Sequence, residues 1–171
     1  MDCISLGERS GSADEGRYVM YRSTKTYGNE VGLSCAFRQW RADSHCNKLH
    51  GYSLGFRFTF EAAELDERNW VYDFGDCKWI KKYLEIEFDH RLAVAKDDPN
   101  LERILHTVYQ EIADINVMDG VGCEKFAEKV YNYVSPKVYT DTKGRVSVYS
   151  VECFEHGANS AIYINPYGSG V

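Results

Sequence analysis

The sequence predicts an α+β fold in which a four-stranded antiparallel sheet is covered by helices on one face. Segments in which apolar residues alternate with polar ones stand near both ends of the chain, and segments with helical spacing stand between them. Helices that lie between pairs of strands in this way are typical of an antiparallel sheet with its helices on one side. Such a sheet leaves two open edges, and pairing between copies of the chain would close them into a barrel.

The composition indicates one globular domain. The chain has 171 residues, of which 44% are hydrophobic and 27% charged, and its net charge is −6. This acidic balance argues against a general nucleic-acid binder, which would carry a basic surface. Residues 1–17 are polar, so we expect a flexible N-terminal segment followed by a single domain over residues 18–171.

The cysteines and the hydropathy favour a cytoplasmic protein. Six cysteines are scattered without a metal-binding spacing, and the first residues lack the apolar core of a secretory signal. No apolar stretch approaches the roughly 18 residues that a membrane helix needs. We therefore expect free thiols in a reducing compartment, with a disulfide framework as the less supported alternative.

Four strands are expected. The clearest covers residues 52–61, where one face carries only large apolar side chains, which we assign to the core. Another begins near Tyr18, is interrupted over residues 28–32 and resumes over residues 33–37. The last two cover residues 145–154 and 160–164. The apolar face of the clearest strand consists of Tyr52, Leu54, Phe56, Phe58 and Phe60, and it continues back to His50.

Three helices are expected between these strands. Asp73 is a suitable N-cap for the first, Asp98-Pro99-Asn100 opens the second, and the third begins near Cys123 and ends at Pro136, which removes a helical hydrogen bond. Their apolar stripes are, in order, Phe74, Cys77, Ile80 and Leu84; Leu101, Ile104, Leu105, Val108 and Ile112; and Phe126, Ala127, Val130 and Val134.

Two short runs carry the residues best suited to chemistry. Cys46 begins the run Cys46-Asn47-Lys48-Leu49-His50-Gly51-Tyr52, and Asp89-His90 follows about forty residues later. Together they supply a thiol, an imidazole and a carboxylate that orients it, which are the groups needed to move protons on a small substrate. The alternatives are that Cys46 is a loop cysteine without a role and that Asp89-His90 bonds only to backbone.

These runs belong to an ordered series that resembles the family of 6-pyruvoyltetrahydropterin and 6-carboxytetrahydropterin synthases. The family shows F-x-A-A-H, C-x-x-x-H-G-H, D-F-x-x-L-K, L-D-H, P-T-x-E and V-x-E-T in this order. The corresponding segments of this chain are Leu33 to Phe37, Cys46 to Tyr52, Asp73 to Lys78, Phe88 to His90, Gly122 to Glu124, and Val151 to Cys153.

The resemblance implies the tunnelling fold (T-fold) and a homo-oligomer, a hexamer or another trimer-based assembly, with sites between subunits. It implies a lyase that acts on 7,8-dihydroneopterin triphosphate or a related reduced pterin, in pterin or in queuosine and 7-deazapurine biosynthesis. Cys46 would exchange protons together with Asp89 and His90 of a neighbouring subunit. The ring would be anchored by Glu152, with Glu124 and Cys123 along its rim.

General chemistry supports a carboxylate anchor. A pterin presents adjacent N–H donors on one edge, and a carboxylate accepts two of them in a strong charge-assisted pair. If Glu152 is not such an anchor, its position in an apolar strand requires a partner such as Arg57. Glu124 is also explained by its place in a first helical turn, where the helix dipole favours negative charge.

The chain differs from the family in the residues expected to bind the metal ion. The family holds Zn²⁺ with three histidines, but Phe37 and Tyr52 occupy two of those positions and only His50 remains. Catalytic zinc requires three protein ligands and an open position. Either Cys35, His45 and His50 form a rearranged site, or aromatic rings fill the metal cavity and His50 is a hydrogen-bonded histidine at the start of a strand.

Two further departures bear on the site and its surroundings. Gly122-Cys123 replaces the usual Pro-Thr, and residues 91–121 exceed the usual link, so we expect this insertion to cover the mouth of the site or to alter a subunit contact. The rival to a lyase is a non-catalytic T-fold protein that binds a pterin, a purine or a nucleotide. A structural paralogue with neither ligand nor turnover is a third, weaker reading.

Overall fold

The computed structural model describes residues 20–107 and 112–166, so the expected flexible segment over residues 1–17 lies outside the described residues. The described strands and helices follow the mixed α+β order that the sequence predicts. They are β1 (Tyr21–Tyr27), η1 (Asn29–Val31), β2 (Leu33–Phe37), η2 (His45–Asn47), β3 (His50–Ala62), η3 (Phe74–Cys77), α1 (Lys78–Phe88), β4 (Arg91–Ala95), α2 (Leu101–Thr107), β5 (Asp114–Met118), α3 (Cys123–Asp141), β6 (Ser147–His156) and β7 (Asn159–Ile164).

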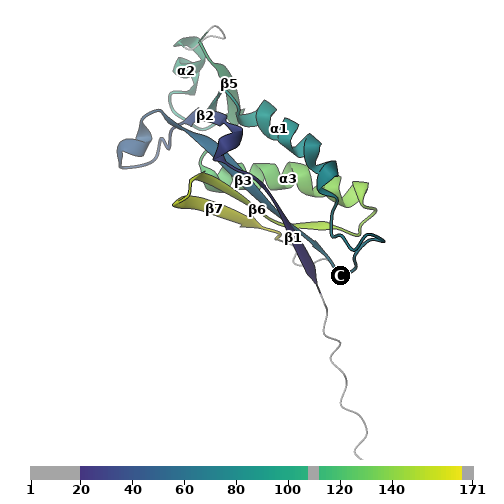
Figure 1. Cartoon of the computed structure of the whole chain (residues 1–171). Helices are drawn as coiled ribbons and strands as arrows, with labels where there is room; N and C mark the ends of the chain where they lie inside the picture. The colour runs from purple at the N-terminus through teal and green to yellow at the C-terminus, as the bar shows by residue number, and fades with distance from the viewer. Residues whose placement is uncertain (1–19, 108–111, 167–171) are drawn as a thin grey trace, which may run out of the picture.

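β3 is the central strand of the sheet. Its first half pairs with β2 and its second half with β1 along one edge, while β6 pairs along the other edge. The strand order is β5-β4-β2-β3-β6-β7, with β1 beside β3 (Figure 1). The four strands expected from the sequence therefore correspond to β1 with β2, β3, β6 and β7.

The prediction of a four-stranded, wholly antiparallel sheet is wrong, because the described residues form seven strands. The 3₁₀-helix η1 separates β1 from β2, and β4 and β5 extend the sheet with parallel pairs beyond β2. β4 buries Leu92, Ala93, Val94 and Ala95 in succession. Parallel strands are commonly buried on both faces and lack alternation, so this five-residue segment gives no period-two signal.

The core lies between the sheet and the helices α1 and α3, which cover the same face (Figure 1). The predicted core face of β3 is confirmed, because Leu54, Phe56, Phe58 and Phe60 are fully buried. Phe88 at the end of α1 joins the layers: its ring centroid lies 5.0 Å from that of Phe56 and 5.2 Å from that of Phe126 in α3.

Two helices differ from expectation. α3 does not end at Pro136 but continues to Asp141. Pro136 removes only one backbone donor, and the apolar stripe continues beyond it to Val138, which is fully buried. The second helix is described only to Thr107; the expected stripe residue Val108 lies outside the described residues. Ile112 is 77% exposed and does not continue a buried stripe.

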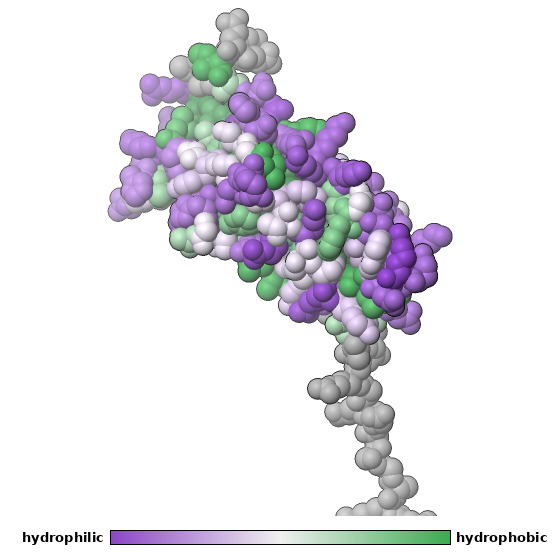
Figure 2. Space-filling view, viewed as in Figure 1, coloured by the Kyte–Doolittle hydropathy of each residue, from purple (hydrophilic) through white to green (hydrophobic). Residues whose placement is uncertain are grey.

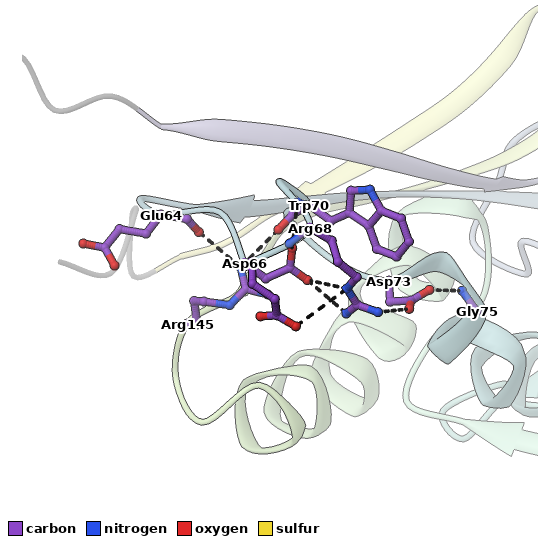
Figure 3. A network of polar contacts seen from close by, with 8 residues as sticks. Glu64, Asp66, Arg68, Trp70, Asp73, Gly75 and Arg145 are labelled. Carbon is purple, nitrogen blue, oxygen red and sulfur yellow. Dashed lines mark hydrogen bonds and ion pairs between the residues drawn. The ribbon is translucent and has the colours of Figure 1, made fainter.

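Charged side chains fix the loop that leads from β3 into α1. Arg68 binds Asp66 and Asp73, each with an N–O distance of 3.0 Å (Figure 3). The other oxygen of Asp73 accepts the Gly75 backbone N–H at 2.8 Å. Asp73 is thus the cap that the sequence predicts, although it caps the 3₁₀-helix η3, which continues directly into α1. No helix within the described ranges is long and apolar enough to cross a membrane.

Phe126→Ala tests whether the packing around Phe88 holds the two layers together. Truncating a fully buried phenylalanine leaves a cavity, so the free energy of unfolding should fall by about 3–5 kcal/mol in urea titrations. Ile86→Ala, at a 55% exposed position of α1, is the control and should change it by less than about 1 kcal/mol. A small loss for Phe126→Ala would contradict this account of the core.

Candidate functional site

The candidate site lies where the core face of β3 begins. Phe37 of β2 pairs with His50 of β3, and Tyr52 follows His50 on the same face. The ring centroids of Phe37, His50 and Tyr52 lie 5.0–6.1 Å apart, and the Phe37 ring also packs against Phe126 of α3 at 5.2 Å. The three positions that correspond to the family's zinc ligands therefore converge, but they form an aromatic cluster.

His50 has a defined tautomer. Its Nδ1 lies 2.8 Å from the backbone carbonyl oxygen of Lys48. A carbonyl oxygen can only accept, so Nδ1 carries the hydrogen and donates it. In the neutral ring, Nε2 then remains free to accept a proton or a hydrogen bond.

The Cys46 loop is tied to the start of α3. Cys46 lies in η2, where its N–H donates to the Ser44 hydroxyl and its carbonyl accepts the Gln39 N–H. The Gln39 side chain donates to the Val121 carbonyl at 2.7 Å. Gly122 has a φ of +100°, and a side chain there would strike the Gln39 amide. Glycine at this position thus lets the loop and the helix start approach each other.

Tyr52 is surrounded by acidic and thiol groups. Burial raises the pKa of the Tyr52 hydroxyl, and the nearby Glu155 carboxylate and the thiols of Cys46 and Cys123 raise it further. Cys123 is buried at the first position of α3. These groups come from η2, β3, α3 and β6, so one small volume joins four elements far apart in the sequence.

The buried thiols beside this volume are neutral. Burial raises the pKa of Cys35 to about 12, and burial together with the Cys123 thiol raises the pKa of Cys153 well above its usual range. A thiolate is the nucleophilic and metal-binding form of cysteine. Cys35 and Cys153 therefore act as small apolar groups, whereas Cys46 is only partly buried.

The sheet places Glu152 on the other side from His50 and Tyr52. Val151 and Cys153 are buried beneath the helices, so Glu152 between them points to the opposite face. Its side chain is 18% exposed and binds Arg57 at 3.1 Å, the ion-pair alternative that the sequence leaves open. The carboxylate of β6 that reaches Tyr52 is Glu155.

Sequence reasoning missed Glu155 and His156. His156 also lies at Tyr52, with a centroid distance of 6.1 Å. The signal for Glu155 was available, since it shares the period-two face of Val151 and Cys153. The V-x-E pattern pointed instead to the glutamate between them, because a short motif fixes spacing but not the face of the strand.

Asp89 and His90 form a pair away from this cluster. Their side chains lie 2.8 Å apart, and Asp89 also accepts the Ser34 N–H at 3.3 Å. His90 is 84% exposed and has a φ of +54°. The pair adjoins the start of β2, whereas Phe37 and His50 lie at its end. Within a single chain, Asp89 and His90 therefore do not lie beside Cys46.

Glu124 is exposed in the first turn of α3, close to Gly122. In that position its charge is favourable to the helix dipole whether or not a ligand is bound. Cys123, the other expected rim residue, is buried and faces Cys153 and Tyr52. Of the two, only Cys123 belongs to the cluster around Tyr52.

The side chains present do not fit the zinc ion of the resembling family. Across residues 20–107 and 112–166, no three His, Cys, Asp or Glu side chains are grouped as a metal site would require. This includes Cys35, His45 and His50, so the rearranged site is not formed. Phe37, almost fully buried, stands at a position where the resemblance assigns a metal-binding histidine, and its ring cannot ligate a metal ion.

The order and pairing of the strands and the two helices on one face of the sheet are those of the T-fold. The sequence profile described as 6-pyruvoyl tetrahydropterin synthase matches residues 28–166. The chain belongs to this family. No protein of curated annotation matches the chain significantly.

Similar solved structures agree on the fold. An uncharacterized protein from Wolinella succinogenes has a TM-score of 0.71 and 20% identity, covering 86% of this chain and 99% of its own. A catalytic-residue mutant of Plasmodium vivax 6-pyruvoyltetrahydropterin synthase has a TM-score of 0.63 and 14% identity. The match covers 86% of this chain and 98% of the mutant's chain. The 6-pyruvoyl tetrahydropterin synthase of Plasmodium falciparum has a TM-score of 0.60 and 12% identity. The match covers 85% of this chain and 98% of that enzyme's chain.

Restoring two histidines tests the geometry of the cluster. Since Phe37 and Tyr52 converge on His50, the variant Phe37→His/Tyr52→His should bind about one zinc ion per chain, and the unchanged chain less than about 0.1, by elemental analysis. Circular dichroism shows whether the variant folds. Stoichiometric zinc in the unchanged chain, or none in a folded variant, would contradict this geometry.

Proposed function

We propose that the protein is a pterin-metabolising lyase that acts on 7,8-dihydroneopterin triphosphate or a related reduced pterin. The observation that carries the proposal is the Glu155 carboxylate, which faces the same side of the sheet as Tyr52 and His50 at the start of α3. A carboxylate at the end of a partly buried site suits the adjacent N–H donors of a pterin edge. Glu155 takes the anchoring role that the sequence assigned to Glu152.

The residues around the ring have distinct tasks. Glu155 accepts two N–H donors and fixes the orientation of the heterocycle, and Cys123 lines its rim. The Tyr52 hydroxyl, whose pKa is raised by burial and by Glu155, stays protonated near neutral pH and is available as a donor. Because Cys46 and Glu155 both lie near Tyr52, we propose that the side chain of the fixed pterin extends toward the Cys46 loop.

In this proposal, Cys46 and a histidine from a second chain transfer the protons. Cys46 exchanges a proton with the side chain of the pterin, and His90, oriented by Asp89, serves as its acid or base partner. Within a single chain these groups lie apart. The proposal therefore requires a homo-oligomer in which Asp89 and His90 of a neighbouring subunit reach Cys46. The high exposure of His90 supports such a contact.

A non-catalytic protein that binds a pterin, purine or nucleotide is the second candidate. The aromatic cluster of Phe37, His50 and Tyr52 favours it, because the family's metal ligands have been replaced by groups that pack and stack. The binder needs Glu155 but neither Cys46 nor His90. Incubation with 7,8-dihydroneopterin triphosphate, with and without added zinc and followed by mass spectrometry, separates the candidates, because only the lyase forms a new pterin.

Glu155→Gln should weaken binding of 7,8-dihydroneopterin by about 10- to 100-fold in fluorescence titrations. The variant keeps the shape of the side chain but loses a charge-assisted bond, which is worth about 1.5–3 kcal/mol. Glu152→Gln is the matched control on the opposite face and should change the dissociation constant by less than about twofold. The reverse order of effects would restore Glu152 as the anchor.

Cys46→Ala should lower kcat for 7,8-dihydroneopterin triphosphate by about 100-fold or more, the usual contribution of a general acid or base. Binding of 7,8-dihydroneopterin should stay within about threefold, because Cys46 does not hold the ring. Unchanged turnover in this variant would remove Cys46 from the mechanism. Turnover by neither chain, with tight binding by both, would support the binder.

A further inference from the structure

A cavity of about 570 Å³ lies at the other end of β3 from the candidate site. Its lining comes from the end of β3, from α3 and from the turn before β6, and includes Glu61, Tyr131, Tyr139 and Arg145. At roughly 3.3 Å per residue of strand, Glu61 lies about 30 Å from Tyr52, so this cavity is separate from the site around Tyr52. Figure 2 shows hydrophilic and hydrophobic side chains side by side at this end of the molecule, at the lower right.

Glu61 carries the feature that points to a ligand. Its side chain is fully buried, and one carboxylate oxygen, Oε2, is held by Arg22 through N–O distances of 2.8 and 2.7 Å. The other oxygen, Oε1, is buried and has no hydrogen-bond partner within the described residues. A buried carboxylate oxygen without a donor costs free energy, and nearly all buried polar groups in folded proteins have a partner. A molecule bound in the cavity can supply the missing donor.

The charges around Glu61 favour a neutral donor over a cation or an anion. Arg22 already neutralises the Glu61 carboxylate. Glu64 and Arg145 add charges of opposite sign to the lining, so the cavity as a whole is close to neutral. In the part of the chain that the structure describes, Arg145 donates to two backbone carbonyl oxygens and forms no ion pair. Its remaining N–H groups can therefore donate to a carbonyl group of a ligand.

Aromatic side chains of α3 give the cavity an apolar wall. Tyr139 is 58% exposed, and its ring lies against Gly144, where a side chain would come within 3.1 Å of the Tyr139 hydroxyl oxygen. Gly144 has a φ of +84°, so glycine at this position both turns the chain and leaves room for the ring. Tyr131 and Pro136 line the cavity from the same helix. Tyrosine rings stack favourably on other flat rings.

We propose that this cavity binds a neutral, flat lactam heterocycle such as a purine base, whose ring N–H donates to Glu61 and whose carbonyl group accepts from Arg145. A carboxylic acid would bring a second negative charge to Glu61, and a purely apolar ring would leave the Glu61 oxygen without a donor. The proposal goes beyond the pterin function and does not rest on it, because the cavity shares no residue with the candidate site. Hypoxanthine, which carries a ring N–H beside a carbonyl group, is the probe.

Isothermal titration of the full chain with hypoxanthine tests the site. Glu61→Gln should raise the dissociation constant by about tenfold or more, because a charge-assisted hydrogen bond is lost, and circular dichroism shows whether this variant folds. 1-Methylhypoxanthine, in which a methyl group replaces the ring hydrogen beside the carbonyl, should bind the unchanged chain about tenfold more weakly or worse. No binding of hypoxanthine by the unchanged chain, or equal affinities for the two compounds, would overturn the proposal.

The aromatic wall has a matched pair of variants in α3. Tyr139→Ala removes a ring that lines the cavity and should raise the dissociation constant for hypoxanthine by about fivefold or more. Tyr133→Ala removes a similarly exposed ring that stacks on Tyr83 instead, and it should change the constant by less than about twofold. Because both positions are more than half exposed, both variants should fold. Equal effects of the two changes would overturn the proposal.

Glu155→Gln separates this cavity from the candidate site. It should change the dissociation constant for hypoxanthine by less than about twofold, because Glu155 does not line the cavity. Loss of hypoxanthine binding in Glu155→Gln but not in Glu61→Gln would overturn the proposal and assign the purine to the candidate site. Hypoxanthine binding that depends on Glu61, in a chain that binds no pterin, would refute the proposed function and support this cavity as a binding site.

Discussion

The alternation of side chains along β3 is the constraint on which the structure depends. One face of this strand carries Phe56, Phe58 and Phe60 into the core, and the same face continues to Tyr52 and His50 at the candidate site. A shift of one residue would exchange the two faces, so the packing of the core also sets the position of the site. The neighbouring strand β2 brings Phe37 to that face through its register with β3, and Glu155 of β6 lies close to Tyr52.

The sequence predicted those parts of the molecule whose signal is local. The aromatic face of β3, the Asp73 cap and the order of the family motifs are each readable within a few residues, and the structure agrees with them. β4 was missed because a short strand buried on both faces has no alternation. Glu155 was missed because the V-x-E pattern pointed to Glu152, although Glu155 shares the period-two face of Val151 and Cys153.

The candidate site places aromatic rings at two of the three positions where the resembling family has metal-binding histidines. Phe37 and Tyr52 stand where the resemblance expects metal-binding histidines, and their rings pack against each other. Burial keeps the thiols of Cys35 and Cys153 neutral, because it raises their pKa values. In the proposed function, the ligand is oriented and protons are moved by side chains at the margin of the cluster, in particular Glu155 and Cys46.

The parallel strands β4 and β5 have a consequence for how the chain folds. An open strand edge is a template for pairing with other chains, and β4 seals the edge of β2 with residues from much later in the sequence. Pairings between distant segments form late. A chain in which β4 has not yet paired therefore exposes this edge of β2. By covering this edge, β4 removes a site at which the sheet could pair with other chains.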